Sequence, residues 1–112
     1  MIAITGADGF IGKHLAQYLF KKGIKARRIT REGNNNTFAI GNISRKTNWY
    51  EALNNIEVLI HCASITSIDN QNSSNIAKLN EVNIKATKNM IKQAAKIGVK
   101  RIIFIKAYQF VS

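Results

Sequence analysis

Short apolar runs alternate with longer amphipathic stretches along this 112-residue chain. Runs of this length predict strands, which we place at Ile2–Ile4, Ile24–Thr30, Phe38–Ile40, Ile56–Cys62 and Lys100–Ile105. The centre of the fourth run is continuously apolar, as is typical of a parallel strand covered on both faces. Strands that alternate with helices favour an α/β fold, a doubly wound parallel sheet in three layers. Right-handed crossovers then predict the strand order 3-2-1-4-5.

Two stretches carry apolar side chains at helical spacing. The first runs from Phe10 to Lys22, ends at Gly23, and has an apolar face made of Ile11, Leu15, Tyr18 and Leu19. The second runs from about Ser74 to Ile97, with an inner face of Ile76, Leu79, Asn83, Ala86, Met90, Ala94 and Ile97. A buried asparagine needs hydrogen-bond partners, so Asn83 either ties down neighbouring backbone or reaches a ligand.

A third, short helix is predicted between the third and fourth strands. Ser44 or Thr47 is expected to cap it, and its apolar side chains are Trp49, Ala52 and Leu53. Trp49 is expected in the core or at an interface rather than as a platform for a ligand.

The first strand runs directly into a glycine-rich turn, residues 5–12, with the sequence TGADGFIG. Gly6 allows a sharp turn where a Cβ would clash, Gly9 leaves room for a pyrophosphate, and Gly12 lets the helix pack on the sheet. The helix that follows directs its N-terminal N–H groups at a phosphate, so a dinucleotide is expected to lay its pyrophosphate on the backbone of Phe10 and Ile11. The spacing is G-x-x-G-x-x-G, and a strand-to-helix turn without a ligand is the alternative.

The end of the second strand is where a dinucleotide fold reads the adenosine ribose. An acidic residue there accepts hydrogen bonds from the 2′-hydroxyl, whereas an arginine accommodates a 2′-phosphate. Arg31 occupies this position and favours NADP over NAD, and Glu32 beside it keeps NAD as the alternative.

Charge and cysteine content narrow the class of protein. The net charge is +11, and six basic residues crowd between Lys21 and Arg31, but aromatic residues do not interleave with the remaining cations. We therefore expect a solvated basic surface near a phosphate-bearing cofactor rather than a nucleic-acid site. No apolar run approaches the roughly 18 residues that span a membrane, and no signal peptide is expected before the first predicted strand. The lone Cys62 forms no internal disulfide, so a cytoplasmic setting is expected, and no metal site is expected because no second Cys or suitably spaced His is present.

Several segments, in order along the chain, resemble the extended short-chain dehydrogenases/reductases, specifically the NAD-dependent epimerase/dehydratase group. Residues 5–12 are similar to its TGxxGxxG cofactor motif, and Gly41–Ile43 stands where the group carries Gly-Asp-Ile/Leu beside the adenine. Residues 58–64, VLIHCAS, resemble its V-I-H-L-A-A strand. Residues 82–91, VNIKATKNMI, resemble V-N-v-x-G-T-x-N-L-L, and residues 99–104, VKRIIF, resemble V-K-R-F-V-F.

This resemblance implies a Rossmann domain over residues 1–112 that binds NADP or NAD. The implied adenosine site lies between Arg31 and Asn42–Ile43, where Asn42 replaces the usual aspartate, and Ala63–Ser64 lies alongside the ribose. The full set of expected cofactor-binding residues is Gly6, Gly9, Phe10, Ile11, Gly12, Arg31, Asn42, Ile43, Cys62, Ala63, Ser64, Thr66 and Asn83.

The chain departs from the group where the group carries its catalytic residues. Lys106–Ala107 stands in place of the serine-rich turn whose last Ser or Thr is catalytic, and no Tyr-x-x-x-Lys follows the fifth predicted strand. No catalytic residue is therefore assigned. We expect a truncated, nucleotide-sugar epimerase/dehydratase-like oxidoreductase without a substrate domain, inactive alone and prone to self-association, whose full-length relatives take a nucleotide sugar. The alternatives are a non-catalytic nucleotide-sensing protein and a structural partner that completes its site with another chain.

Overall fold

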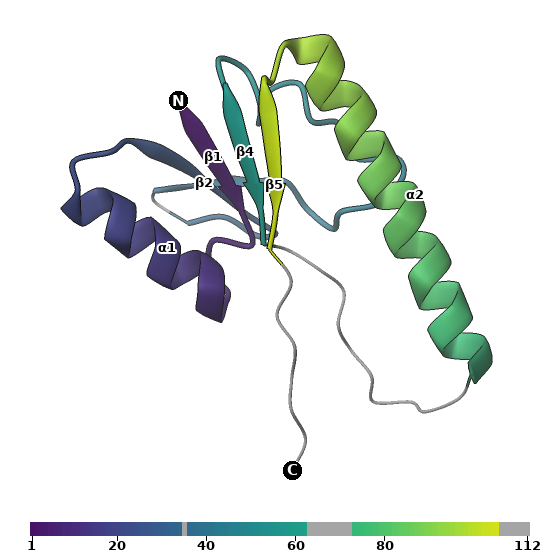
Figure 1. Cartoon of the computed structure of the whole chain (residues 1–112). Helices are drawn as coiled ribbons and strands as arrows, with labels where there is room; N and C mark the ends of the chain where they lie inside the picture. The colour runs from purple at the N-terminus through teal and green to yellow at the C-terminus, as the bar shows by residue number, and fades with distance from the viewer. Residues whose placement is uncertain (35, 63–72, 106–112) are drawn as a thin grey trace.

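The structure is a computed structural model that describes residues 1–34, 36–62 and 73–105, with residues 73–76 described by their backbone only. Within these residues five parallel strands form one sheet in the order β3-β2-β1-β4-β5. The strands are β1 (Ile2–Thr5), β2 (Ala26–Thr30), β3 (Thr37–Ala39), β4 (Val58–His61) and β5 (Arg101–Phe104). Helix α1 (Phe10–Lys21) lies on one face and helix α2 (Ser73–Ile97) on the other (Figure 1). The predicted Rossmann-like α/β fold, its three layers and its strand order are confirmed.

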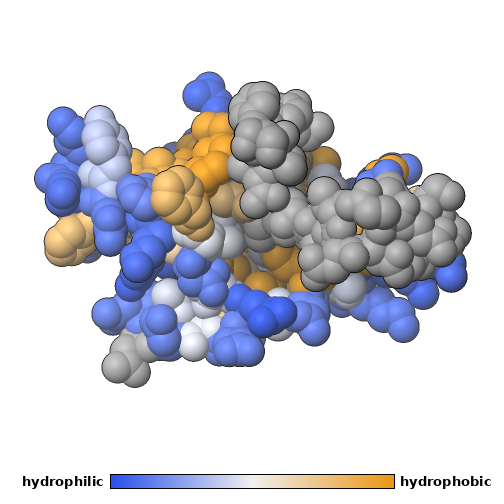
Figure 2. All heavy atoms as spheres, turned by 90° about the horizontal axis from the view of Figure 1, so that it is seen from below, coloured by the Kyte–Doolittle hydropathy of each residue, from blue (hydrophilic) through white to orange (hydrophobic). Residues whose placement is uncertain are grey.

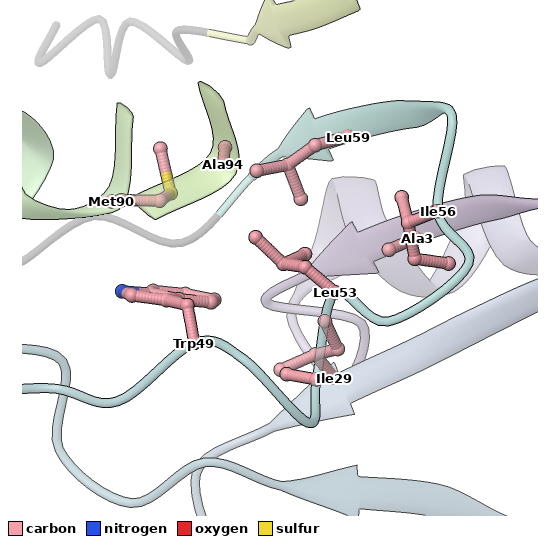
Figure 3. Packing of buried hydrophobic residues seen from close by; sticks show 9 residues of the cluster. Ala3, Ile29, Trp49, Leu53, Ile56, Leu59, Met90 and Ala94 are labelled. Carbon is pink, nitrogen blue, oxygen red and sulfur yellow. The ribbon is translucent and has the colours of Figure 1, made fainter. Parts of the chain in front are cut away.

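Two hydrophobic clusters lie on opposite faces of the sheet, because successive side chains of a strand point to opposite sides. On the α2 face, Ala3 and Leu59 are fully buried with Trp49, Leu53 and other members of one cluster. Figure 3 shows this cluster, with Met90 and Ala94 on the α2 ribbon and Trp49 and Leu53 on the connection that faces it. The α1 face has a smaller buried cluster made of Ile4, Ala7, Leu19 and Ile60. Each helix therefore covers one face of the central strands, which explains their continuous apolar sequences.

The predicted short helix between the third and fourth strands was wrong. Residues 50–55 instead form consecutive turns, and the Leu53 N–H donates to the Trp49 carbonyl at 2.9 Å. The helix does not continue because Asn55 adopts a left-handed backbone conformation, with φ of 64°. The predicted burial of Trp49 was right, since its side chain is 0% exposed, and the other predicted boundaries agree to within two residues. The second strand shows one such shift, since it begins at Ala26 rather than Ile24.

Candidate functional site

A cavity of about 1010 Å³ opens at the carboxyl-terminal edge of the sheet. Its described lining comes from the ends of all five strands and from the side of α2 that carries Asn80 to Lys88. Figure 2 looks at this edge and shows apolar side chains between polar rims. Open α/β sheets bind ligands at this edge, at the point where the direction of strand addition changes. Here β2 and β3 lie on one side of β1, and β4 and β5 lie on the other. The cavity is therefore the candidate site.

The glycine turn between β1 and α1 borders the cavity through Gly6 and Asp8. Gly6 has φ of 62°, a conformation that side chains disfavour. A Cβ on Gly12 would overlap the Gly6 carbonyl oxygen and would lie 2.8 Å from the Gly6 carbonyl carbon. A Cβ on Gly9 would lie 3.3 Å from the same oxygen, to which the Gly9 N–H donates at 3.0 Å. Gly12 is thus required for the first turn of α1 to lie against the end of β1.

Helix α1 begins at Phe10, immediately after this turn. The N–H groups of Phe10 and Ile11 belong to its first turn, where backbone donors have no partner within the helix. The first turn carries no acidic side chain to compete for these donors. Together with the partial positive charge of a helix N-terminus, such donors favour an anion.

The opposite wall of the cavity joins the end of β2 to the chain after β3. The Ile40 N–H donates to the Thr30 carbonyl, and the Gly41 N–H donates to the Arg31 carbonyl, both at 2.9 Å. These bonds extend the β2–β3 pairing and place Asn42 and Ile43 beside Arg31 on the cavity wall. The Arg31 guanidinium lies 3.8 Å from the Glu32 carboxylate, and both side chains are largely exposed. A pair this exposed contributes little energy, so Arg31 remains available to an anionic ligand.

His61, at the end of β4, lines the cavity and was not among the predicted cofactor-binding residues. Its Nδ1 lies 2.7 Å from the Thr5 hydroxyl, which also accepts the Cys62 N–H at 3.1 Å. The His61 ring meets the Phe104 ring edge-on, with 5.8 Å between centroids. Burial lowers the pKa of His61 to about 4, so the ring is neutral at pH 7. Its position at the carboxyl end of a buried strand was the sequence signal that could have identified it.

Helix α2 supplies the last wall. Asn83, predicted as the polar residue on the inner face, is half-buried and lines the cavity. Thr87 and Lys88 line it as well and were missed, although Thr87 follows Asn83 by four residues and so shares its side of the helix. This part of α2 therefore offers an amide, a hydroxyl and an ammonium group.

The predicted cofactor-binding residues divide into three groups. Those that line the cavity are Gly6, Arg31, Asn42, Ile43 and Asn83. Those placed nearby but outside the described lining are Gly9, Phe10, Ile11, Gly12 and Cys62. Cys62 packs against the cluster on the α1 face, and burial raises the pKa of its thiol. Ala63, Ser64 and Thr66, together with Lys106–Ala107, lie outside the described residues.

A tyrosine and a lysine with Tyr-x-x-x-Lys spacing do occur in the chain, at Tyr18 and Lys22 near the end of α1. Tyr18 is 58% exposed, which corrects its predicted place on the apolar face of this helix. The Lys22 ammonium lies 5.5 Å from the centroid of the Tyr18 ring. Neither residue lines the cavity, so this pair has no access to a ligand bound there.

Among the described residues no group of three or more His, Cys, Asp or Glu side chains is placed to hold a metal ion. The described helices include none long and apolar enough to cross a membrane.

Comparison with known proteins links these features to a family. The chain is 32% identical to UDP-glucose 4-epimerase of Vibrio cholerae over 95% of its length, and 34% identical to UDP-N-acetyl-alpha-D-glucosaminuronate decarboxylase of Bacillus cytotoxicus over 90%. It covers 34% of each of these proteins, so it spans about a third of their length. The solved structure of MoeE5 in complex with UDP-glucose and NAD superimposes with a TM-score of 0.73 over 92% of this chain and 35% of that one, at 24% identity. The model of the NAD dependent epimerase/dehydratase family matches residues 2–110. The chain belongs to the NAD dependent epimerase/dehydratase family.

Proposed function

We propose that this chain is the NAD(P)-binding part of a nucleotide-sugar epimerase/dehydratase-type oxidoreductase and that its cavity takes the dinucleotide. The observation that carries the proposal is the position of the cavity, between a glycine turn at the end of β1 and the wall formed by Arg31, Asn42 and Ile43. The pyrophosphate would lie on the N–H groups of Phe10 and Ile11, and the adenosine between Arg31 and Asn42–Ile43. The other half of the dinucleotide, beyond the pyrophosphate, would extend toward the part of the cavity lined by His61.

Arg31 supports a preference for NADP over NAD. Its guanidinium lines the cavity at the end of β2 and is more than half exposed, so a 2′-phosphate can reach it without breaking a buried ion pair. Hydrogen bonds between charged groups are worth about 1.5 to 3 kcal/mol, which corresponds to roughly tenfold to a hundredfold in affinity.

The binding proposal is tested by calorimetry of the wild-type chain with NADP and NAD. Gly9→Val places a branched side chain where the pyrophosphate would lie, and should abolish binding while the circular dichroism spectrum stays native. Arg31→Asp should reverse the preference between the two nucleotides, and Lys25→Asp, an exposed charge change outside the described lining, serves as its control. Equal wild-type affinities for NADP and NAD would contradict the role of Arg31. No binding of either would contradict the proposed function.

The 112-residue chain is expected to turn over no nucleotide sugar by itself. Such reactions need a proton-transfer group within hydrogen-bond reach of the substrate, and losing it costs about 10²- to 10⁴-fold. Lys106–Ala107 stands where relatives carry a hydroxyl, and the Tyr18–Lys22 pair lies away from the cavity. An assay with NADP or NAD and common nucleotide sugars checks this, and turnover proportional to protein concentration would contradict it.

We also propose that copies of this chain associate with one another through the edge of β5. This strand stands at one end of the sheet order, and Ile103 and Phe104 are 40% and 48% exposed. An open strand edge with apolar side chains is a template for pairing with another chain. Sedimentation should find species larger than a monomer, and Ile103→Lys should shift the distribution toward the monomer. A wild-type chain that sediments as a monomer at all concentrations would contradict this.

A further inference from the structure

The backbone of the cavity wall at Asn42 and Ile43 is hydrogen-bonded to one buried threonine, Thr47. The Thr47 hydroxyl accepts the Ser44 N–H at 2.8 Å and donates to the Asn42 carbonyl at 3.3 Å. It therefore bonds the backbone on both sides of Ile43, which lines the cavity between Asn42 and Ser44. Thr47 is only 8% exposed, so these bonds are shielded from water and would be costly to leave unmade.

Thr47 is in turn held by two amide side chains of α2. Asn89 Nδ2 donates to the Thr47 carbonyl at 2.9 Å and to the Ser44 carbonyl at 3.3 Å. Gln93 Nε2 donates to the Thr47 carbonyl at 2.7 Å and to Asn89 Oδ1 at 2.7 Å. Gln93 Oε1 also accepts the backbone N–H of Trp49 at 2.6 Å. The loop is thus tied to the same helix that forms another wall of the cavity through Asn83 and Thr87.

We propose that Thr47, braced by Asn89 and Gln93, is the positioning residue of the adenosine end of this site. Its hydroxyl fixes the backbone of Asn42–Ser44 at the distance from Arg31 that the nucleotide requires. Thr47 lies outside the described lining, so it acts through Ile43 and not by touching the ligand. This inference rests on the proposed function, because it assigns a role within the same site.

The test compares Thr47→Val with Thr47→Ser in the full chain. Valine removes the hydroxyl and keeps the branched shape, whereas serine keeps the hydroxyl and loses a methyl group. The control is Thr37→Val. The Thr37 hydroxyl likewise has two hydrogen-bond partners, the Asn34 N–H at 2.6 Å and the Thr30 hydroxyl at 3.1 Å, but Thr37 lies outside the described lining and neither partner belongs to Asn42–Ser44. The measurements are the dissociation constants of NAD and ADP-ribose by calorimetry, the melting temperature, and amide exchange at Ser44.

Thr47→Val should weaken NAD and ADP-ribose alike by about tenfold and should speed exchange of the Ser44 amide. Thr47→Ser should restore both values, and Thr37→Val should lower the melting temperature without changing either affinity. Thr47→Val affinities within twofold of wild type, or an equal loss in Thr37→Val, would overturn the inference while leaving the proposed function intact. A wild-type chain that binds none of NAD, ADP-ribose and NADP would instead overturn the proposed function, and with it any positioning role for Thr47. Unchanged Ser44 exchange in Thr47→Val would separately show that the wall does not depend on Thr47.

Discussion

The two walls of the cavity are built in different ways. The turn between β1 and α1 takes its shape from backbone contacts within residues 5–12, where Gly12 lies against Gly6. The connection between β3 and β4 has no helix or strand of its own and takes its shape from side chains of α2, 42 to 46 residues farther along the chain. The first wall is a local structure, and the second exists only once the helix has packed on the sheet.

This difference matters for what each wall can tolerate. A local turn depends on whether a Cβ fits at particular positions, so a substitution there acts through steric overlap. The β3–β4 connection depends on burial and on hydrogen bonds from α2, so substitutions there act through cavities and unmade bonds. Stability measurements on matched pairs of variants can separate the two cases.

The largest expected loss in the free energy of unfolding comes from a substitution in the β3–β4 connection. Leu53 is fully buried on the α2 face of the sheet, whereas Leu15 of α1 is only half-buried. Leu53→Ala should therefore cost about 4 kcal/mol of the free energy of unfolding, and Leu15→Ala about 2 kcal/mol. Urea denaturation of both variants measures the difference. A larger loss in Leu15→Ala would show that the helix, rather than the irregular connection, carries more of the core.

The next effect is steric and lies in the glycine turn. Gly12→Ala forces its Cβ onto the Gly6 carbonyl, so the first turn of α1 must shift, at an expected cost of about 3 kcal/mol. Gly9→Ala is the matched control, because its Cβ would keep 3.3 Å from the same oxygen and its φ of −77° suits any residue. Thermal denaturation should show a near-native melting temperature for Gly9→Ala only. Equal losses in the two variants would mean that the turn relaxes and that Gly12 is not a fixed contact.

The free energy of unfolding is expected to depend on pH through His61, which is partly buried at the end of β4. The pKa of His61 is lowered to about 4 in the fold from an ordinary value of 6.5. As pH falls through 6.5 the unfolded chain takes up a proton that the folded chain does not, so folding stability is lost toward pH 4. From pH 7 to pH 5 this loss amounts to about 2 kcal/mol.

His61→Gln removes the titrating ring and should flatten this pH dependence relative to wild type. His14→Gln is the control, because His14 is an exposed residue of α1 whose Nδ1 bonds only the Phe10 carbonyl of its own helix. Denaturation at pH 7 and pH 5 gives the comparison. Identical pH dependence in wild type and His61→Gln would contradict the assignment.

The contrast between the two walls also explains which parts of the fold and of the site could be predicted from the sequence and which could not. The order of the strands and the glycine turn follow from local patterns, namely apolar runs, helical spacing and three glycines at fixed intervals. The β3–β4 connection was predicted as a helix because Trp49, Ala52 and Leu53 have helical spacing, but its form depends on Asn55 and on amides of α2 that no local pattern announces. His61 and Thr87 were missed although each carried a sequence signal, namely the end of a buried strand and a spacing of four residues from Asn83. Only the assembled sheet and helix show that both reach one cavity.

The smallest expected change in the free energy of unfolding comes from left-handed backbone positions. It tests whether the strain at such a position is the same in the β3–β4 connection as after α1. Asn55, in the β3–β4 connection, has φ of 64°, and Gly23, after α1, has φ of 73° and open space where a Cβ would lie, with no atom within 4 Å. Alanine in a left-handed conformation costs about 1 to 2 kcal/mol, so Asn55→Ala and Gly23→Ala should each lower the free energy of unfolding by about 1 kcal/mol. Asn55→Gly should be close to neutral, because glycine adopts this conformation without strain but loses more entropy on folding. Chemical denaturation of the three variants resolves differences of this size. If Asn55→Ala cost much more than Gly23→Ala, the asparagine side chain would be contributing contacts of its own, and the connection would depend on local interactions as well as on α2.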